Sequence, residues 1–323
     1  MTDDIQLVYN DKEYTILNRW ETISPEHYLQ LTADLLRFSS GELSPGQVRI
    51  NHLCRIMNWQ KRRFRTEEQI ANLVAISQQL TFLFQIDYLD NNDILDTLDA
   101  HSRNLCKHIP PHRLNIPMAR VLQKLNYQYV VNLCFFAQLL PTVTIDNKVY
   151  HAYQLSSSYN ALTCSLTALQ YIEARSLLTQ GEQALPLLAA ILFFPGSVYN
   201  SQRAHALADI FATLPPHVLA AISFNFQAVN TYLFTKTPFS LLAKFKPSKT
   251  ALITTDAADA IYDLSKDGLG DAAQVEQINL ITYLKLLRKK TIDAVHSLHG
   301  IGWDKTKISS EVALPIDIIN QII

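Results

Sequence analysis

VYNDKEY, residues 8–14, returns later in the chain as TIDNKVY, residues 144–150. In both copies an Asn and Asp pair precedes a lysine, and a tyrosine follows two positions after that lysine. Asn and Asp tolerate the left-handed backbone conformation that a tight reversal requires, and the flanking residues alternate between apolar and polar. Each copy therefore predicts a β-hairpin, the first over residues 5–17 and the second over residues 142–154.

The repeat continues beyond the hairpins. Ser24 with Pro25 and Ser44 with Pro45 are typical helix starts, and apolar residues follow them at steps of three and four. The dipeptide Gly-Glu occurs at Gly41 and again in the second half, separated by nearly the same interval as the two repeated lysines. We therefore predict two similar halves in a pseudo-two-fold arrangement. Because a lone hairpin is marginal in water, the two hairpins either pair with each other or lie on their own helices.

The rest of the sequence predicts mainly helices. Apolar periodicity favours a helix from residue 66 towards 84, a long and very apolar one from 118 to about 141, and another over 162–172. The intervening stretch, residues 87–117, includes three prolines in KHIPPHRLNIP and is predicted as a loop or short helical turns. The fold class that follows is mainly α with small β content (α+β), each half being a β-hairpin followed by a helical bundle.

A helical C-terminal tail completes the predicted organisation. Composition changes at KTPFSLLAKFKPSKT, and a long amphipathic helix through Val295 follows. We therefore divide the chain into residues 1–140, 141–246 and 247–323. The tail ends in apolar residues that need a covering surface, either the body of the protein or a partner. These candidate partner-binding residues are Val312, Leu314, Ile316, Ile318, Ile319, Ile322 and Ile323.

Composition narrows the class of protein. The 323 residues are 48% hydrophobic and 18% charged, enough to bury a sizeable core, and the net charge of -1 argues against a chain built around nucleic acid. The run WQKRRFR, residues 59–65, mixes basic and aromatic residues and keeps a peripheral nucleic-acid site as an alternative. The start lacks the basic and apolar regions of a secretory signal, and Asn225 interrupts the longest uncharged stretch. A soluble protein of the bacterial cytoplasm, without a membrane partner, is expected.

No motif in the sequence points to a reaction. The four cysteines are widely spaced, and His296 and His299 lack a supporting glutamate and suit a helix end better than a metal site. His108 and His112 flank two prolines in a predicted loop. Regularly spaced aspartates between residues 87 and 99 lack the glycine and glutamate of a calcium loop. We therefore predict no catalytic, cofactor-binding or metal-ligating residue.

Several segments resemble the uncharacterised proteins encoded among phage tail and prophage genes of Bacteroidetes-type bacteria. These are the first hairpin with RWETISPEHYLQL, and then YIEARSLL, LLAAILFFPGSVYN and LADIFATLP in the second half. The resemblance implies a non-enzymatic structural or chaperone-like assembly role near the tail, through contacts with tail components or with itself, and possible association with the virion. An enzyme of unknown reaction, with a pocket between the two halves, is the alternative.

Overall fold

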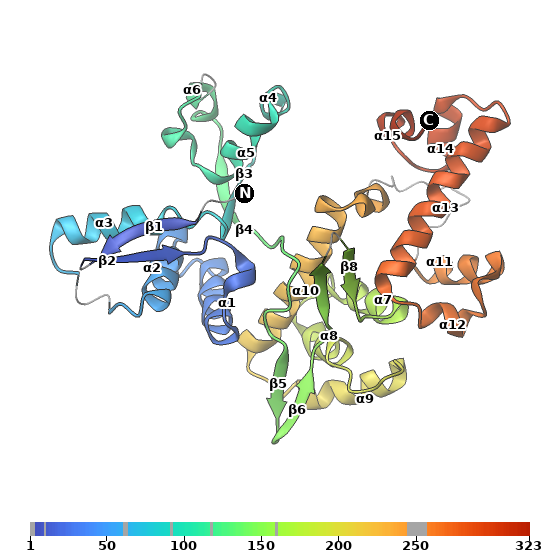
Figure 1. Ribbon diagram of the computed structural model, residues 1–323, viewed down its shortest axis with the longest axis horizontal. Coiled ribbons are helices and arrows are strands. Elements are labelled where there is room, and N and C mark those ends of the chain that lie inside the picture. The colour runs from blue at the N-terminus through green and yellow to red at the C-terminus, as the bar shows by residue number, and fades with distance from the viewer. Residues whose placement is uncertain are drawn as a thin grey trace. The chain divides into compact units, whose positions relative to one another are not determined.

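The computed structural model describes residues 4–9, 11–60, 64–90, 93–116, 119–158, 161–243 and 257–323. The chain forms two compact units, an N-terminal unit of Met1–Leu133 and a C-terminal unit of Cys134–Ile323. Both consist mainly of helices with small antiparallel hairpins, which confirms the predicted fold class (Figure 1). The C-terminal unit includes the predicted tail, and the boundary predicted between residues 246 and 247 lies outside the described residues.

The repeated motif forms the two predicted hairpins. In the N-terminal unit β1 (Ile5–Tyr9) pairs with β2 (Lys12–Ile16), and in the C-terminal unit β5 (Thr142–Ile145) pairs with β6 (Lys148–His151). In both, the last residue of the first strand faces the lysine that starts the second, so two residues make the reversal. The described turn residues have φ angles of 57°, 49° and 62° at Asp11, Asp146 and Asn147. The motif therefore occurs twice because the same two-residue turn is built twice.

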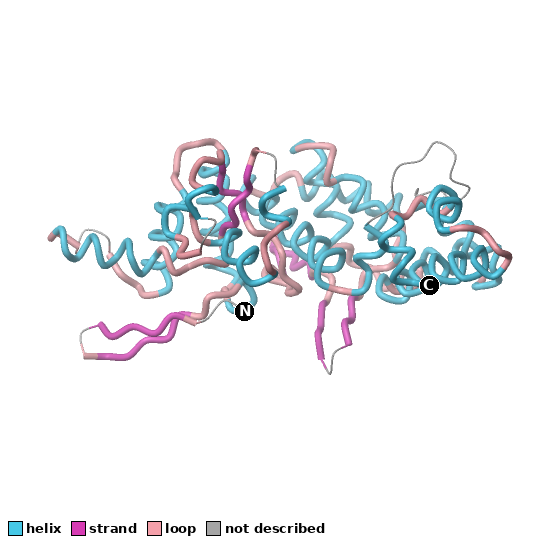
Figure 2. The backbone as a smooth tube through the Cα atoms, turned by 90° about the horizontal axis from the view of Figure 1, so that it is seen from above, coloured by secondary structure: helices cyan, strands magenta, loops and turns pink. Residues whose placement is uncertain are grey.

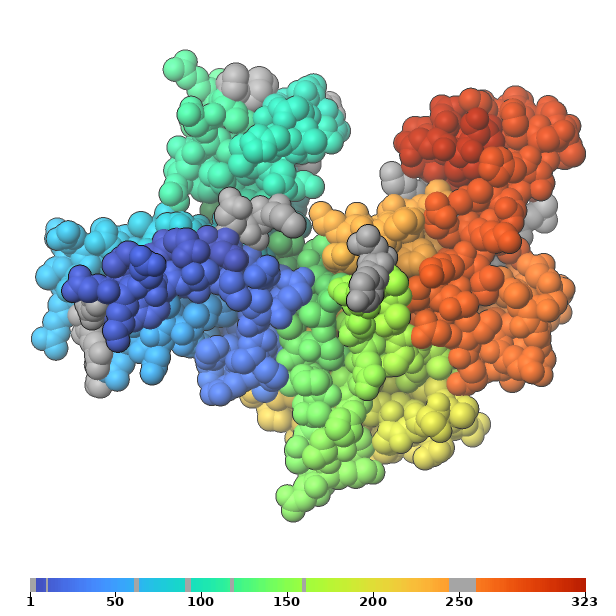
Figure 3. Space-filling view, viewed as in Figure 1, coloured from blue at the N-terminus to red at the C-terminus, as the bar shows by residue number. Residues whose placement is uncertain are grey.

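Each hairpin is a separate two-stranded sheet. The two predicted hairpins do not pair with each other, and two unpredicted sheets join them among the described residues. β3 (Phe84–Tyr88) pairs with β4 (Tyr127–Val131), and β7 (Leu155–Ser158) pairs with β8 (Ala161–Cys164). β1–β2 extends beyond the helices of its own unit (Figure 2), and the tip of β5–β6 protrudes from the C-terminal unit (Figure 3).

Three predicted helices are wrong in extent. The long helix over residues 118–141 is reduced to α6 (Ala119–Leu122), because the aromatic and β-branched run YQYVV forms β4 against a distant partner. The helix over 66–84 stops as α3 (Glu67–Ser77), before the chain extends into β3. The helix over 162–172 begins only at α7 (Ala168–Leu177), because residues 161–164 form β8.

The N-terminal unit is held by capped helices and an aromatic core. The predicted starts are confirmed: Ser24 caps α1 (Pro25–Ser39), and a capping box at Ser44 starts α2 (Pro45–Ile56). Trp20 lies edge-on to Tyr28 and Phe82 and donates its indole N–H to the carbonyl of Asn132 at 2.8 Å. The short helices after β3 are α4 (Asp93–Asp96), α5 (Ala100–His108), the 3-10 turn η3 (Pro111–Arg113) and α6.

The C-terminal unit is a larger set of helices. Its long helix α10 (Pro216–Lys236) is buried, and the polar residues that interrupt its uncharged sequence have partners. Asn225 bonds the backbone of residues 137 and 139, and Asn230 accepts from the Tyr171 hydroxyl at 2.7 Å. The other helices are α8 (Leu185–Leu192), α9 (Ser201–Phe211), α11 (Ala257–Leu264), α12 (Ala272–Glu276), α13 (Leu280–Gly300), α14 (Lys305–Glu311) and α15 (Ile316–Ile322).

No helix in the described part of the chain combines the length and the hydropathy that crossing a membrane would take.

The repeated Gly-Glu dipeptide marks a second structural equivalence. Gly41 follows α1 with a φ of 80°, and Gly181 follows α7 with a φ of 81°. Gly41 directly follows the C-cap of α1, whereas Gly181 is the N-cap of the 3-10 helix η4 (Glu182–Ala184), so both left-handed glycines turn the chain towards the next helix. The shared order of the two units is hairpin, helix, left-handed glycine and helix, with β7–β8 inserted in the C-terminal unit.

A Gly41→Ala substitution isolates the cost of this backbone conformation. A Cβ atom at Gly41 would meet nothing within 4 Å, so the expected loss of about 1 kcal/mol in unfolding free energy comes from the positive φ alone. Gly46→Ala is the control, because Gly46 lies in α2 with ordinary helical backbone and is expected to be neutral or slightly stabilising. Urea unfolding of both variants measures the difference, and equal effects would contradict the expectation.

Candidate functional site

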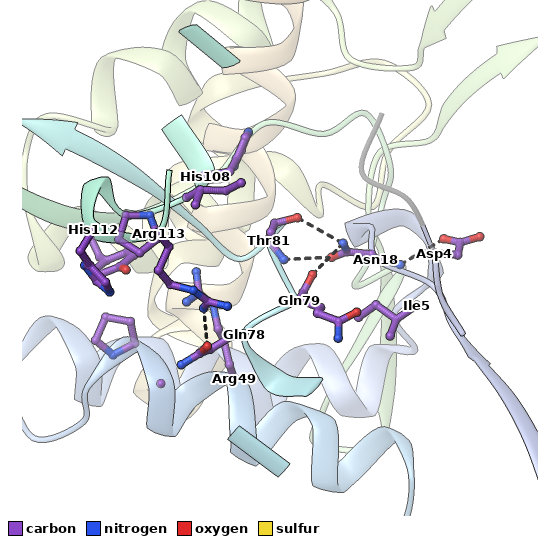
Figure 4. Close-up of a pocket in the computed structure, with 15 residues that line it drawn as sticks. Asp4, Ile5, Asn18, Arg49, Gln78, Gln79, Thr81, His108, His112 and Arg113 are labelled. Carbon is purple, nitrogen blue, oxygen red and sulfur yellow. Dashed lines mark hydrogen bonds between the residues drawn. The ribbon is translucent and has the colours of Figure 1, made fainter. Parts of the chain in front are cut away.

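A cavity of about 580 Å³ opens in the N-terminal unit (Figure 4). It lies between the start of α2, the loop that joins α3 to β3 and the connection from α5 to η3. Its volume is in the range of pockets that hold small molecules. The lining residues that matter chemically are Asp4, Asn18, Arg49, Gln78, Gln79, His108, His112, Arg113 and Tyr129.

Arg49 is the cation at the base of this cavity. It projects from α2 and is only 6% exposed. Its Nε–H donates to the carbonyl of Leu80 at 3.1 Å, and its guanidinium carbon lies 5.3 Å from the ring centre of Phe84 and 5.4 Å from that of Tyr129. Burial lowers the pKa of Arg49, but an arginine stays protonated at any physiological pH. The cavity therefore has a fixed positive charge held between two aromatic rings.

Arg113 is the second cation of the cavity. It is exposed, comes from η3 and donates from Nη1 to the side-chain carbonyl of Gln78, as Figure 4 shows. The charge of Arg113 adds to the effect of burial in lowering the pKa of Arg49, so the two guanidinium groups repel each other. Within the described ranges, neither group forms an ion pair with a carboxylate. This end of the cavity is therefore positively charged without an internal counter-ion.

The opposite end of the cavity is polar and internally satisfied. Asp4 accepts the backbone N–H of Asn18 at 3.2 Å and pairs with Arg19 at 3.6 Å. The Asn18 side chain donates to the carbonyl of Gln79 at 3.0 Å and accepts the N–H of Thr81 at 3.1 Å. These bonds fix the end of β2 to the segment before β3, so Asn18 positions the wall of the cavity. The arrangement as a whole is suited to binding a group that is negatively charged at one end and polar at the other.

The histidines of HIPPH lie at this cavity and were not predicted to bind anything. His112 is exposed on η3, whereas His108 is partly buried at the end of α5. Figure 4 shows both on the Arg113 side of the cavity. Arg49 was missed altogether, because the sequence analysis assigned only the apolar residues of α2 to its buried face, and an arginine on a helix is normally exposed. The segment RINH, residues 49–52, places several polar residues in one turn of a helix that is otherwise buried, and this pattern could have pointed to the site.

The other predicted motifs do not assemble into a chemical site. His296 and His299 are both exposed on the last turns of α13. In the part of the chain that the structure describes, no group of three potential metal ligands comes together. Asp99, one of the regularly spaced aspartates, caps α5 by accepting two backbone N–H groups. Cys164 is buried, and burial raises its pKa to about 12, so its thiolate is not available for chemistry near neutral pH.

The basic run WQKRRFR is only partly within the described chain. Trp59 contacts Tyr9 of the first hairpin, with ring centres 4.7 Å apart, and Phe64 at 5.6 Å. Residues 61–63, which contain three of the basic side chains, lie outside the described residues. Trp59 therefore packs on the hairpin that carries the repeated motif, and Phe64 packs on Trp59.

The apolar residues of the C-terminal tail form a small core of their own. Val295 of α13 packs with Ile308 of α14, and four of the seven candidate partner-binding residues are buried in the same cluster. Those four are Val312, Leu314, Ile318 and Ile319. Ile322 and Ile323 pack on the edge of the cluster, and Ile316 is 44% exposed. Most of the tail's apolar surface is thus covered within the C-terminal unit, and contact with a partner stays a prediction, with Ile316 as its most accessible residue.

Comparison of the chain with protein-family models, with curated proteins and with solved structures gives no match.

Proposed function

We propose that this chain is a non-enzymatic structural or assembly protein, associated with a phage or prophage tail, that acts through protein–protein contacts. Association with a tail is supported by the sequence resemblance alone. The contact function is supported by one observation on the repeated hairpins: in each, one member of the cross-strand pair next but one to the turn is an exposed valine. An extended segment of a partner protein is the occupant that this surface favours.

The two exposed valines lie in the equivalent cross-strand pair of the two hairpins, Val8 on the first strand of its hairpin and Val149 on the second strand of its own. Val8 pairs with Glu13 across β1–β2, and Val149 pairs with Thr144 across β5–β6, in each case one pair away from the turn. Val8 is 71% exposed and Val149 is 50% exposed. A β-branched side chain on a strand contributes most when a neighbouring strand or helix covers it. Both hairpins therefore carry an apolar position that their own units leave uncovered.

The hairpins also carry unpaired backbone edges. Among the described residues each is a sheet of two strands, so no third strand satisfies the outer N–H and C=O groups. Such an edge can accept an extended segment of a partner as an added strand, and side chains on the hairpin face then give specificity. The lysines beside both turns, Lys12 and Lys148, disfavour uncontrolled edge-to-edge association because they charge the edge. The free edges and the charged lysines together favour a contact with a specific partner over self-association.

The test is a Val8→Lys and Val149→Lys double variant, assayed by calorimetry or biolayer interferometry. Its binding partners would be purified phage tail-tube and tape-measure proteins. We expect at least roughly tenfold weaker binding, because a charge would have to be buried at the contact, and little change in thermal stability. Val198→Lys is the matched control, since Val198 is 64% exposed and lies outside the hairpins. Unchanged binding in the double variant, or an equal loss in the control, would exclude the hairpins as the contact surface.

A further inference from the structure

We infer that the cavity of the N-terminal unit binds a small organic phosphate, with its phosphate group held between Arg49 and Arg113. This inference concerns a ligand, whereas the proposed function concerns hairpin contacts, so neither depends on the other. The inference is argued from the cavity, from the burial of Arg49 and from the two guanidinium groups, neither of which is ion-paired with a carboxylate of the described residues.

The burial of Arg49 leaves donors that a ligand can use. A guanidinium group has five N–H donors in a planar fork. The N–H donor on Nε bonds the carbonyl of Leu80, and a hydrogen bond with the Tyr129 side chain occupies part of the other donors. Arg49 nevertheless lines the open cavity, where Figure 4 shows its guanidinium group facing the Gln78 side chain. A buried cation normally has an anionic partner, and here the position of that partner is open to a ligand.

A phosphate group fits two guanidinium groups better than a carboxylate does. A phosphate monoester carries close to two negative charges at neutral pH and offers three terminal oxygens. One pair of oxygens can bind the fork of Arg49 while the third accepts from Arg113. The same doubly charged group would offset the repulsion between the two arginines, which a single carboxylate would neutralise only in part. Gln78 now accepts from Arg113 and would have to release it, which the exposed side chain of Arg113 permits.

The rest of the cavity indicates that the phosphate belongs to a larger molecule. About 580 Å³ is far more space than one phosphate group fills. The wall away from the arginines has the amide of Gln79 and the carboxylate of Asp4, which can bond hydroxyl groups. The side of Tyr129 adds an apolar wall. A hydroxylated carbon skeleton, such as that of a sugar phosphate, matches this lining.

Calorimetric titration of the full chain with ribose 5-phosphate tests the inference. We expect binding of ribose 5-phosphate, weaker binding of inorganic phosphate and no binding of ribose. Arg49→Met removes the buried charge but keeps an apolar stem, and Arg113→Gln removes the exposed one. Each is expected to weaken binding by roughly tenfold or more. Arg120→Gln is the matched control, because Arg120 is an exposed arginine of the same unit outside the cavity lining.

The outcomes separate the parts of the inference. If Arg49→Met fails to fold, Arg113→Gln still tests phosphate binding. Its side chain is exposed, so the variant is expected to fold with an unchanged circular dichroism spectrum. Absence of binding by ribose 5-phosphate would overturn the site, and so would a loss in Arg120→Gln as large as in Arg113→Gln. Succinate binding as tightly as ribose 5-phosphate would overturn the choice of phosphate. Inorganic phosphate binding as tightly as the ester would overturn the assignment of an organic ligand.

Discussion

Replacing Asn225 with leucine is expected to lower the unfolding free energy of the C-terminal unit by about 3 kcal/mol. Asn225 is 2% exposed on α10, accepts the N–H of Leu139 at 2.8 Å and donates to the carbonyl of Ala137 at 2.9 Å. Leucine has a similar volume but leaves both backbone groups without their partner. Each buried group left unpaired costs about 1–3 kcal/mol, more than the gain from an added apolar side chain.

Gln227→Leu is the control for this prediction. Gln227 lies on the same helix and is partly buried, and within the described chain its side chain donates to the hydroxyl of Ser223 at 3.1 Å. Its replacement leaves no buried backbone group unpaired, so a change below about 1 kcal/mol is expected. Urea unfolding followed by circular dichroism measures both variants. Similar stabilities for the two would mean that the bonds of Asn225 add nothing to the packing of residues 137–139.

The second large effect is a loss of stability in acid that originates at His52. This residue is 0% exposed on α2, and neither ring nitrogen has a hydrogen-bond partner among the described residues. Burial, with smaller contributions from the charges of Arg55 and His27, lowers the pKa of His52 from 6.5 to about 3. The folded state therefore binds the proton far less readily than the unfolded state does, and stability falls as the pH drops from 6.5 towards 3.

The size of the His52 effect follows from the width of that pH window. Each pH unit below 6.5 costs about 1.4 kcal/mol, so the loss at two units below is about 3 kcal/mol. His52→Leu removes the titrating group and is expected to reduce the difference in unfolding free energy between neutral and mildly acidic pH by that amount. At neutral pH it is expected to be neutral or stabilising, since two unpaired polar atoms are removed. Parallel pH dependence in the variant and the parent chain would show that His52 does not carry the acid sensitivity.

The elements specified by neighbouring residues were predictable from sequence. The two hairpins follow from an Asn and Asp pair at each turn, and three helix starts follow from Ser24, Ser44 and Thr66. In these elements the residues that determine the geometry lie within a few positions of one another, so the sequence alone is enough to predict them.

The elements specified by distant partners were not predictable. YQYVV, residues 127–131, is apolar enough for a helix or a strand, and only its pairing with residues 84–88 decides between them. The candidate site depends on the same pairing, because β3 and β4 supply Phe84 and Tyr129, the rings that enclose the Arg49 guanidinium. Without the sheet, Arg49 looks like an ordinary solvent-facing helix residue. The cavity thus became visible only with the tertiary structure.

The β3–β4 pair has a consequence for the order of folding during synthesis. β4 ends at Val131, near the last residue of the N-terminal unit, and the Trp20 indole N–H bonds Asn132 just beyond it. The aromatic core around Trp20 and the site at Arg49 therefore stay incomplete on the ribosome until the last residues of this unit have left the exit tunnel. Loop closure is far faster than chain elongation, so it is the emergence of β4 that sets the time of pairing, and β3 lacks its partner strand while the first residues of the C-terminal unit are already being translated.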